Sequence, residues 1–395
     1  MSVRPVLTQL LNGEVHAPEP LGRKHVLVAG GIVVAVADEP ISVSGEVEVE
    51  TVDLQGRRLI PGLIDCHVHL TGGGGEAGFR SQVPRLLLGA LTRGGTTTVV
   101  GVLGTDDSTR STSSLLAATR GLNEEGITAY CLTGGYHLPP TTFTGSVRDD
   151  LVHLDRVLGL GELALSDHRS SQPTLDELLH VVADAHVGGM LAGKSGFTHL
   201  HVGDGDRGLS LIHEALDRSE LPPRVFHPTH VNRRCELFHQ AVELTQRGCT
   251  VDVTAFPVAE GDDGYSAADA VRRFLDSGAP PDRLTVSSDA GGSLPEFDGE
   301  GRVSGWDVGR PEALGEALAE LLGAGMDPAR VLPCFTTNVA RVLGLASKGR
   351  VAVGADADLV VLDKDGRARD VMARGLWHVR GGVQVVHGAF EGVTE

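Results

Sequence analysis

Residues 59–70 read LIPGLIDCHVHL, a short apolar run that ends in two histidines separated by one residue. Runs of this length and hydrophobicity are typical of buried strands. Seven more follow along the chain: TTTVVGVLG (96–104), ITAYCLTGGYH (127–137), VLGLGELALSD (157–167), THLHVGD (198–204), VFHPTHVNR (225–233), TVDVTAFP (250–257) and LTVSSDAGG (284–292). The sequence therefore predicts eight strands between residues 59 and 292.

Segments with apolar residues at helical spacing lie among these runs. They cover residues 81–94, 111–126, 174–193, 208–219, 235–248, 267–278 and 311–325. Strands that alternate with helices over this length predict an α/β fold, a TIM-like (β/α)8 barrel. A doubly wound open sheet is the competing fold, but it requires a glycine-rich phosphate turn that opens a helix after its first strand. GGGGE at 72–76 follows the two histidines and opens no such helix.

Both ends of the chain have a different texture. HVLVAGGIVVAVAD (25–38) holds two apolar runs around a Gly-Gly pair, which predicts a hairpin. The C-terminal segments GRVAVGADADLVVLDKDG (349–366) and WHVRGGVQVVHGAF (377–390) have the same character. We therefore predict a small β-sandwich domain from residues 1–58 plus 346–395, and a (β/α)8 barrel from residues 59–345.

The composition excludes several classes of protein. The 395 residues carry 34 Lys and Arg against 52 Asp and Glu, a net charge of −18. This balance argues against nucleic acid or an anionic membrane as the main partner, and no apolar run is long enough to span a bilayer. The N-terminus lacks the features of a signal peptide. Five scattered cysteines without a C-x-x-C pair indicate reduced thiols, so we expect a cytoplasmic protein.

Side chains that bind metals gather at the ends of the predicted strands, where (β/α)8 barrels place their active sites. His67 and His69 share one strand face because they are two residues apart. Other strand ends contribute further candidates, namely Glu162, His201, His230 and Asp289. Four histidines and two carboxylates fit two divalent cations. His199 is the rival of His201 on the same face, and His227 is expected on the strand face opposite His230.

These motifs resemble the amidohydrolase superfamily and, within it, the isoaspartyl (β-aspartyl) dipeptidases. The resemblance covers nearly the whole chain and rests on PGLIDCHVHL, GGGGEAG, VLGTD, TGGYHLP, SDHRS, PTHVNR and SSDAGGS. It implies a binuclear zinc site in which His67, His69 and Asp289 hold the more buried ion. His201 and His230 would hold the more exposed ion.

The position that bridges both ions is a carboxylated lysine in well-known members of the family. Here that position is Glu162, and its strand holds no lysine. Glutamate supplies the same single negative charge and two oxygens on a shorter arm, so we predict that Glu162 bridges the ions. Lys194 is expected to have a local structural role instead. The site should therefore assemble without CO₂.

The chemistry expected is metal-assisted amide hydrolysis by a hydroxide that bridges the ions, with Asp289 as general base and acid. Tyr136, after the third strand, is expected to stabilise the oxyanion. Arg169 and Arg233 are suited to substrate carboxylates. Glu76, the third catalytic candidate, offers a carboxylate, and the resemblance assigns it to the substrate ammonium. Family positions add three substrate contacts: Gly74, Thr105 and Ser293.

These groups together describe an isoaspartyl dipeptide as the substrate. One alternative is an amidohydrolase of the hydantoinase or dihydroorotase kind, whose cyclic amide substrates lack a free amine. A second alternative is a catalytically inactive scaffold, which would have lost metal ligands. The resemblance also suggests a homo-oligomer, an octamer. The sequence leaves open how Arg169 and Arg233 divide between the two substrate carboxylates.

Overall fold

Eight parallel strands form the centre of the molecule. The computed structural model describes residues 7–259, 261–298, 300 and 302–392. The central strands are β6 (Leu63–Val68), β7 (Thr96–Gly101), β8 (Thr128–Thr133), β9 (Val157–Leu165), β10 (Phe197–Val202), β11 (Phe226–Thr229), β12 (Val251–Thr254) and β13 (Leu284–Ser287). Strands β6 to β11 form one sheet in chain order, and β12 pairs with β13.

Two contacts close these sheets into a ring. Val231 N donates to Asp252 O at 3.3 Å beside β11 and β12, and Val68 forms a parallel bridge with Ala290 beside β6 and β13. All eight strands are buried on both faces, as is usual for parallel strands that helices cover. The predicted barrel is confirmed.

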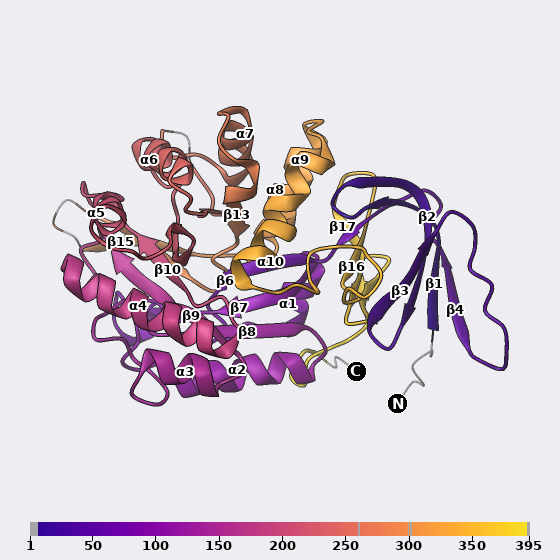
Figure 1. Cartoon of the computed structure of the whole chain (residues 1–395), viewed down its shortest axis with the longest axis horizontal. Helices are drawn as coiled ribbons and strands as arrows, with labels where there is room; N and C mark the ends of the chain where they lie inside the picture. The colour runs from indigo at the N-terminus through magenta and orange to yellow at the C-terminus, as the bar shows by residue number, and fades with distance from the viewer. Residues whose placement is uncertain (1–6, 260, 299, 301, 393–395) are drawn as a thin grey trace.

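Helices surround these strands (Figure 1). They are α1 (Leu88–Arg93), α2 (Thr112–Glu124), α3 (Val147–His153), α4 (Leu175–Ala192), α5 (Ser210–Arg218), α6 (Cys235–Gln246), α7 (Ala267–Asp276), α8 (Ala313–Gly323), α9 (Pro328–Phe335) and α10 (Thr337–Leu343). Short 3₁₀ helices occupy Phe79–Ser81, Pro223–Val225 and Pro281–Arg283. None of the helices in the described part of the chain combines the length and hydrophobicity that crossing a bilayer requires.

The predicted helix over residues 81–94 is wrong in its first half, because helix α1 begins only at Leu88. Pro84 supplies no N–H and disfavours a helical backbone at the residue before it. Val83 N instead donates to Gly73 O at 2.9 Å. The segment thus packs against the glycine run at the mouth of the barrel. Helix α3 and the antiparallel hairpin of β14 (Ser293–Phe297) and β15 (Val303–Val308) are additions that periodicity did not indicate.

The remaining strands come from both ends of the chain and lie beside one another at one end of the molecule (Figure 1). They are β1 (Leu7–His16), β2 (Pro20–Ala29), β3 (Ile32–Ala37), β4 (Val49–Asp53), β5 (Arg58–Pro61), β16 (Leu359–Leu362), β17 (Ala368–Ala373), β18 (Leu376–Arg380) and β19 (Val383–Gln384). They form one nine-stranded sheet, joined where β5 pairs antiparallel with β16. The hairpin of β2 and β3 around Gly30 and Gly31 is as predicted.

Residues from both termini share one apolar core in this β domain. It includes Leu10 and Val26 from the N-terminal part and Leu359, Met372 and Trp377 from the C-terminal part. The boundaries 1–58, 59–345 and 346–395 stay a prediction. Residues 1–6 and 393–395 of that prediction lie outside the described residues.

Candidate active site

Six buried side chains converge at the carboxyl ends of the barrel strands. His67 and His69 lie at the end of β6, Glu162 lies on β9, and His201 lies on β10. His230 and Asp289 follow the ends of β11 and β13. All six predicted metal-binding side chains are therefore brought together, with exposed fractions of 6% or less.

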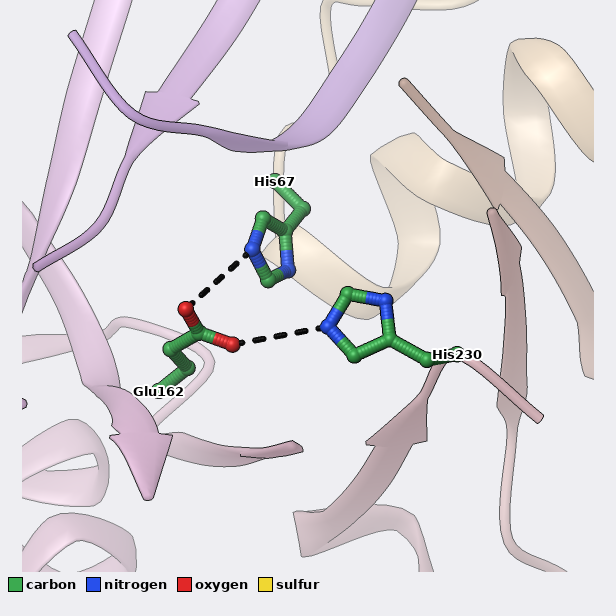
Figure 2. A group of neighbouring side chains, drawn as sticks. All are labelled: His67, Glu162 and His230. Carbon is green, nitrogen blue, oxygen red and sulfur yellow. Dashed lines mark ion pairs between the residues drawn. The ribbon is translucent and has the colours of Figure 1, made fainter. Parts of the chain in front are cut away.

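The carboxylate of Glu162 lies between two pairs of histidines. Its Oε1 is 3.5 Å from His67 Nε2 and 3.3 Å from His69 Nε2. Its Oε2 is 3.3 Å from His201 Nδ1 and 3.6 Å from His230 Nε2. Figure 2 shows this carboxylate pointing at His67 with one oxygen and at His230 with the other. Each oxygen thus faces one histidine pair.

Asp289 completes the cluster on the side of the first pair. Its Oδ1 lies 3.4 Å from His67 Nε2 and 3.1 Å from His69 Nε2. Within the described residues, Asp289 Oδ1 and Glu162 Oε2 are buried without a hydrogen bond of good geometry. Buried carboxylate oxygens without such partners are costly unless a cation binds them.

The arrangement fits divalent cations by the chemistry of its donors. His67, Glu162 and His230 bring ligand atoms within 4.8 Å of one another, and so do His67, His69 and Asp289. Imidazole nitrogens and carboxylate oxygens are common ligands of zinc and similar ions.

The protonation of the cluster reflects its burial and its charges. Burial opposes ionisation of Glu162, but His67 and the nearby His201, 3.3 Å from Oε2, hold its pKa well below the usual range. Burial also opposes ionisation of Asp289, yet His67 and His69 lower its pKa to about 2. Both carboxylates are therefore negative at neutral pH. For His69, burial opposes the charge, but Asp289 and Glu162 raise the pKa to about 10.

Two of these residues adopt the left-handed backbone conformation, which non-glycine residues rarely use. His230 has φ 63° and Asp289 has φ 53°. Local hydrogen bonds hold both turns, from Arg233 N to His230 O at 3.1 Å and from Gly292 N to Asp289 O at 2.9 Å. Such conformations persist only where the surrounding structure maintains them, and they are concentrated at functional sites.

A cavity of about 400 Å³ opens above the cluster. It is lined by four members of the cluster, His69, Glu162, His201 and Asp289. It is also lined by all seven residues predicted to contact substrate: Gly74, Glu76, Thr105, Tyr136, Arg169, Arg233 and Ser293. Gly74 has φ 84°, and a Cβ there would lie 2.3 Å from Ser81 O, so this close approach of backbone requires glycine.

The charged groups of the cavity are held in place by ion pairs. Arg169 Nη1 is 3.3 Å from Glu76 Oε1, and Arg169 Nη2 is 2.7 Å from Asp167 Oδ2. Arg233 Nη1 lies 3.3 Å from Asp204 Oδ1. The two arginines thus sit in one cavity with the carboxylate of Glu76.

Tyr136 contacts the second histidine pair. Its hydroxyl oxygen lies 2.8 Å from His201 Nδ1. Burial raises the pKa of Tyr136 well above its usual value, so the hydroxyl keeps its proton. It can therefore donate a hydrogen bond inside the cavity.

Asp167 is a site residue that sequence reasoning missed. It is buried, and its Oδ2 lies 2.9 Å from His201 Nε2 while both of its oxygens bind Arg169. Its position two residues before Arg169, in the SDHRS motif, is the signal that could have found it. A carboxylate on the far nitrogen of a ligating histidine fixes the orientation of the ring.

The structure refines the expectation for His199 and shows that the expectation for His227 is wrong. His199 does not face Glu162; its Nε2 lies 2.9 Å from His67 Nδ1. His227 was expected on the face opposite His230, but its Nδ1 lies 2.9 Å from His199 Nδ1 in the barrel interior. The expectation failed because His230 lies beyond the end of β11 with a left-handed backbone, so strand alternation does not extend to it.

Lys194 has the local structural role that was predicted. Its Nζ donates to Leu151 O and Leu154 O, both at 2.7 Å. It therefore ties the loop after α4 to the end of α3.

Known proteins share this architecture over most of the chain. A crystal structure of a β-aspartyl dipeptidase from Fervidobacterium islandicum AW-1, in complex with the β-Asp-Leu dipeptide, is 41% identical, with a TM-score of 0.92, and the match covers 97% of this chain and 98% of that one. An imidazolonepropionase from Anaeromyxobacter sp. (strain K) is 28% identical over 91% of this chain and 90% of its own length. A D-hydantoinase structure shares the fold, with a TM-score of 0.66 at 17% identity, and the match covers 97% of each chain.

The family model of the amidohydrolase family matches residues 58–378, which include all six residues of the histidine and carboxylate cluster. The chain therefore belongs to the amidohydrolase family, and it is similar to a β-aspartyl dipeptidase over nearly its whole length.

Proposed function

We propose that this protein hydrolyses the β-aspartyl peptide bond of dipeptides with the help of two divalent cations. The observation that carries the proposal is the cavity, which brings together the histidine and carboxylate cluster, Glu76, Arg169 and Arg233. A β-aspartyl dipeptide has a free amine, two carboxylates and a β-linked amide, so it matches each of these groups. The Fervidobacterium structure, which holds β-Asp-Leu, supports the same substrate class.

The cluster supplies ligands for both cations. His67, His69 and Asp289 would hold one ion, and His201 and His230 would hold the other. Glu162 would bridge them, since each of its oxygens faces a different histidine pair. When bound, such cations polarise a carbonyl and lower the pKa of a bound water. Zn²⁺ is the ion that we propose, because histidine and carboxylate ligands suit it.

Asp289 is the group proposed to move the proton. Its low pKa keeps it ionised, so its carboxylate can accept a proton from the attacking water and later give it to the leaving amine. Tyr136 would donate its hydroxyl hydrogen to the oxygen of the former carbonyl.

The remaining groups would orient the substrate. Glu76 would accept hydrogen bonds from the free ammonium group, while Arg169 and Arg233 would bind carboxylates. Thr105, Ser293 and the backbone at Gly74 lie on the same cavity and would complete the polar contacts.

Location and assembly follow as further parts of the proposal. All five cysteines are free, and only Cys235 is not buried, which supports a reducing compartment such as the cytoplasm. A homo-oligomer is proposed from the family resemblance.

A substrate panel tests the proposal. Purified protein loaded with Zn²⁺ is given β-Asp-Leu, α-Asp-Leu and a hydantoin, and product formation is measured by chromatography. We expect hydrolysis of β-Asp-Leu with a kcat/KM far above that of the other two. Preferential opening of the hydantoin ring would instead support a cyclic amide hydrolase. Zn²⁺-loaded protein without activity on any of these compounds would support a scaffold.

A further inference from the structure

A continuous row of polar side chains runs from the metal-binding cluster down through the barrel interior. His67 Nδ1 lies 2.9 Å from His199 Nε2, and His199 Nδ1 lies 2.9 Å from His227 Nδ1. His227 Nε2 lies 3.0 Å from Thr285 Oγ1, which donates to Asp252 Oδ1 at 2.5 Å. All five residues are at most 1% exposed. Bulk water therefore cannot reach these side chains and replace their contacts with one another.

The carboxylate at the lower end of the row accepts hydrogen bonds from four side chains. Besides Thr285, the donors are Thr229 at 2.7 Å, Ser287 at 2.5 Å and Cys66 at 3.5 Å. An ionised carboxylate can only accept, so the hydroxyl hydrogen of Thr285 points toward Asp252. A second acceptor for this hydroxyl, Val251 O, is more distant at 3.4 Å.

This end fixes the direction of every hydrogen bond above it. The oxygen of Thr285 must accept from His227 Nε2–H, which leaves Nδ1 of the neutral His227 ring without a hydrogen. That nitrogen accepts from His199 Nδ1–H, and the bare His199 Nε2 accepts from His67 Nδ1–H. In the neutral His67 ring, Nε2 then carries no hydrogen, and its lone pair is directed into the cluster, where His69 Nε2 lies 3.3 Å away.

The free lone pair is the one that the proposed metal centre needs. His67 Nε2 is the nitrogen that faces Glu162 Oε1 and Asp289 Oδ1. If every hydrogen bond in the row ran in the opposite direction, the ring hydrogen of His67 would be on Nε2 and would block the binding of a cation. Burial lowers the pKa of His227 to about 4, in agreement with a neutral ring in the row.

Other ligand candidates show shorter versions of the same arrangement. His201 Nε2 contacts Asp167 directly at 2.9 Å, and His230 Nδ1 contacts Thr254 Oγ1 at 2.8 Å. Partners of this kind select the tautomer and the ring orientation of a metal-binding histidine. His67 differs because two further imidazoles and the hydroxyl of Thr285 separate it from the carboxylate of Asp252.

We propose that His199 and His227 are positioning residues that relay a one-way hydrogen-bond chain from Asp252 through Thr285 and keep Nε2 of His67 free to bind the cation. The inference rests on the metal centre of the proposed function and is independent of the substrate. It assigns a role to two buried histidines that neither bind the cation nor touch the substrate.

Neutron diffraction on crystals of the Zn²⁺-loaded protein in D₂O tests the chain directly. We expect deuterium on Nδ1 of His67, on Nδ1 of His199 and on Nε2 of His227. Deuterium on Nδ1 of His227 or on Nε2 of His199 would overturn the inference. If these positions are as expected but β-Asp-Leu is not hydrolysed, the substrate assignment fails and the relay stands.

Metal affinity provides a second test, measured by competition with a chromophoric chelator. Thr285→Val removes the hydroxyl that orients the row, and Ser287→Ala removes a hydroxyl from the same carboxylate outside the row. We expect Thr285→Val to weaken the binding of one ion by about ten-fold, the lower end of typical losses for outer ligand partners. Ser287→Ala should change it much less. Equal affinities in the two variants would contradict the relay.

Replacement of His227 separates the relay from simple packing. Glutamine can accept from His199 and donate to Thr285, whereas leucine can do neither. We expect His227→Gln to retain metal affinity and His227→Leu to lose it, with circular dichroism confirming that both fold. Similar affinities for the two folded variants would overturn the inference.

Discussion

Glu162 is the residue on which the proposed metal centre depends most. Its two oxygens face different histidine pairs at 3.3–3.6 Å. The sequence alone indicated the residue type and its position on the strand. The family resemblance predicted that Glu162 lies between the two histidine pairs, but residue spacing alone could not, because the arrangement depends on four histidines from three other strands.

Glu162 already carries a carboxylate, whereas a lysine at this position would first have to react with CO₂ to form a carbamate. We therefore expect metal content, measured by mass spectrometry of the elements, to be the same in buffers with bicarbonate and in buffers depleted of CO₂. Glu162→Gln keeps the shape but removes the charge, so it should lower metal affinity by more than about ten-fold, the loss caused by outer partners alone. Metal loading that rises with bicarbonate would contradict the account.

The protonation of His69 predicts a pH dependence of metal uptake. Burial opposes its charge, but Asp289 and Glu162 raise its pKa to about 10, so the metal-free ring carries an extra proton at neutral pH. A cation must displace this proton, and its apparent affinity should therefore fall as the pH decreases below 10. Calorimetry in two buffers with different ionisation enthalpies measures the release. Identical heats in both buffers at pH 7 would refute it.

Asp167 connects the proposed metal centre with the substrate cavity, because it contacts both His201 and Arg169. Asp167→Asn removes the negative charge that contacts both His201 and Arg169, while Glu162 still faces His201 and Glu76 still pairs with Arg169. We expect kcat/KM for β-Asp-Leu to fall by about 10–100-fold, as is usual for partners of metal ligands. Asp204→Asn is the control, since Asp204 pairs with Arg233 but is 71% exposed at its side chain. A larger loss in the control would show that Asp167 has no special position.

At the level of elements, the barrel strands were predictable because each is a short apolar run buried on both faces. The hairpin of β14 and β15 was not predictable in the same way. Its residues include exposed positions such as Trp306 and show no strict alternation. It nevertheless lines the cavity through Ser293, Leu294 and Asp307. The periodicity of apolar residues therefore predicted the barrel strands better than it predicted the loops that line the cavity.

The histidines illustrate the same limit. His67 and His69 could be assigned to one face because β6 extends to Val68, the residue between them. His227 could not, because the chain leaves the strand conformation before His230. Asp167 lies in the same kind of irregular segment after β9. Strand alternation predicts side-chain direction only within the strand itself.

At the scale of the whole molecule, the β domain contacts the barrel through a buried lysine that also forms an ion pair within the β domain. Lys348 Nζ lies 2.5 Å from Asp358 Oδ2 and donates to Thr128 Oγ1, on β8 of the barrel, at 2.6 Å. Pairing of β5 with β16 joins the two ends of the chain nearby. The sequence predicted that both ends of the chain share one β domain, but it could not predict the pairing of β5 with β16 or the contact between Lys348 and Thr128, because each joins residues far apart along the chain.

Lys348→Met removes the positive charge but keeps an unbranched side chain that is one atom shorter. It leaves the buried carboxylate of Asp358 uncompensated, so we expect the free energy of unfolding to fall by about 3–5 kcal/mol. Chemical denaturation followed by circular dichroism measures the change. Lys364→Met is the control, because Lys364 is exposed and should leave the stability nearly unchanged. Equal stability of both variants would contradict a supporting role for this ion pair.

The central claim is that this chain is a metal-dependent β-aspartyl dipeptidase. The most direct test removes all metal with a chelator, returns Zn²⁺ in steps and measures the hydrolysis of β-Asp-Leu at each step. The account predicts no activity in the metal-free protein and an activity that rises to its maximum at about two equivalents of Zn²⁺ per chain. Undiminished hydrolysis by the fully demetallated protein would contradict it.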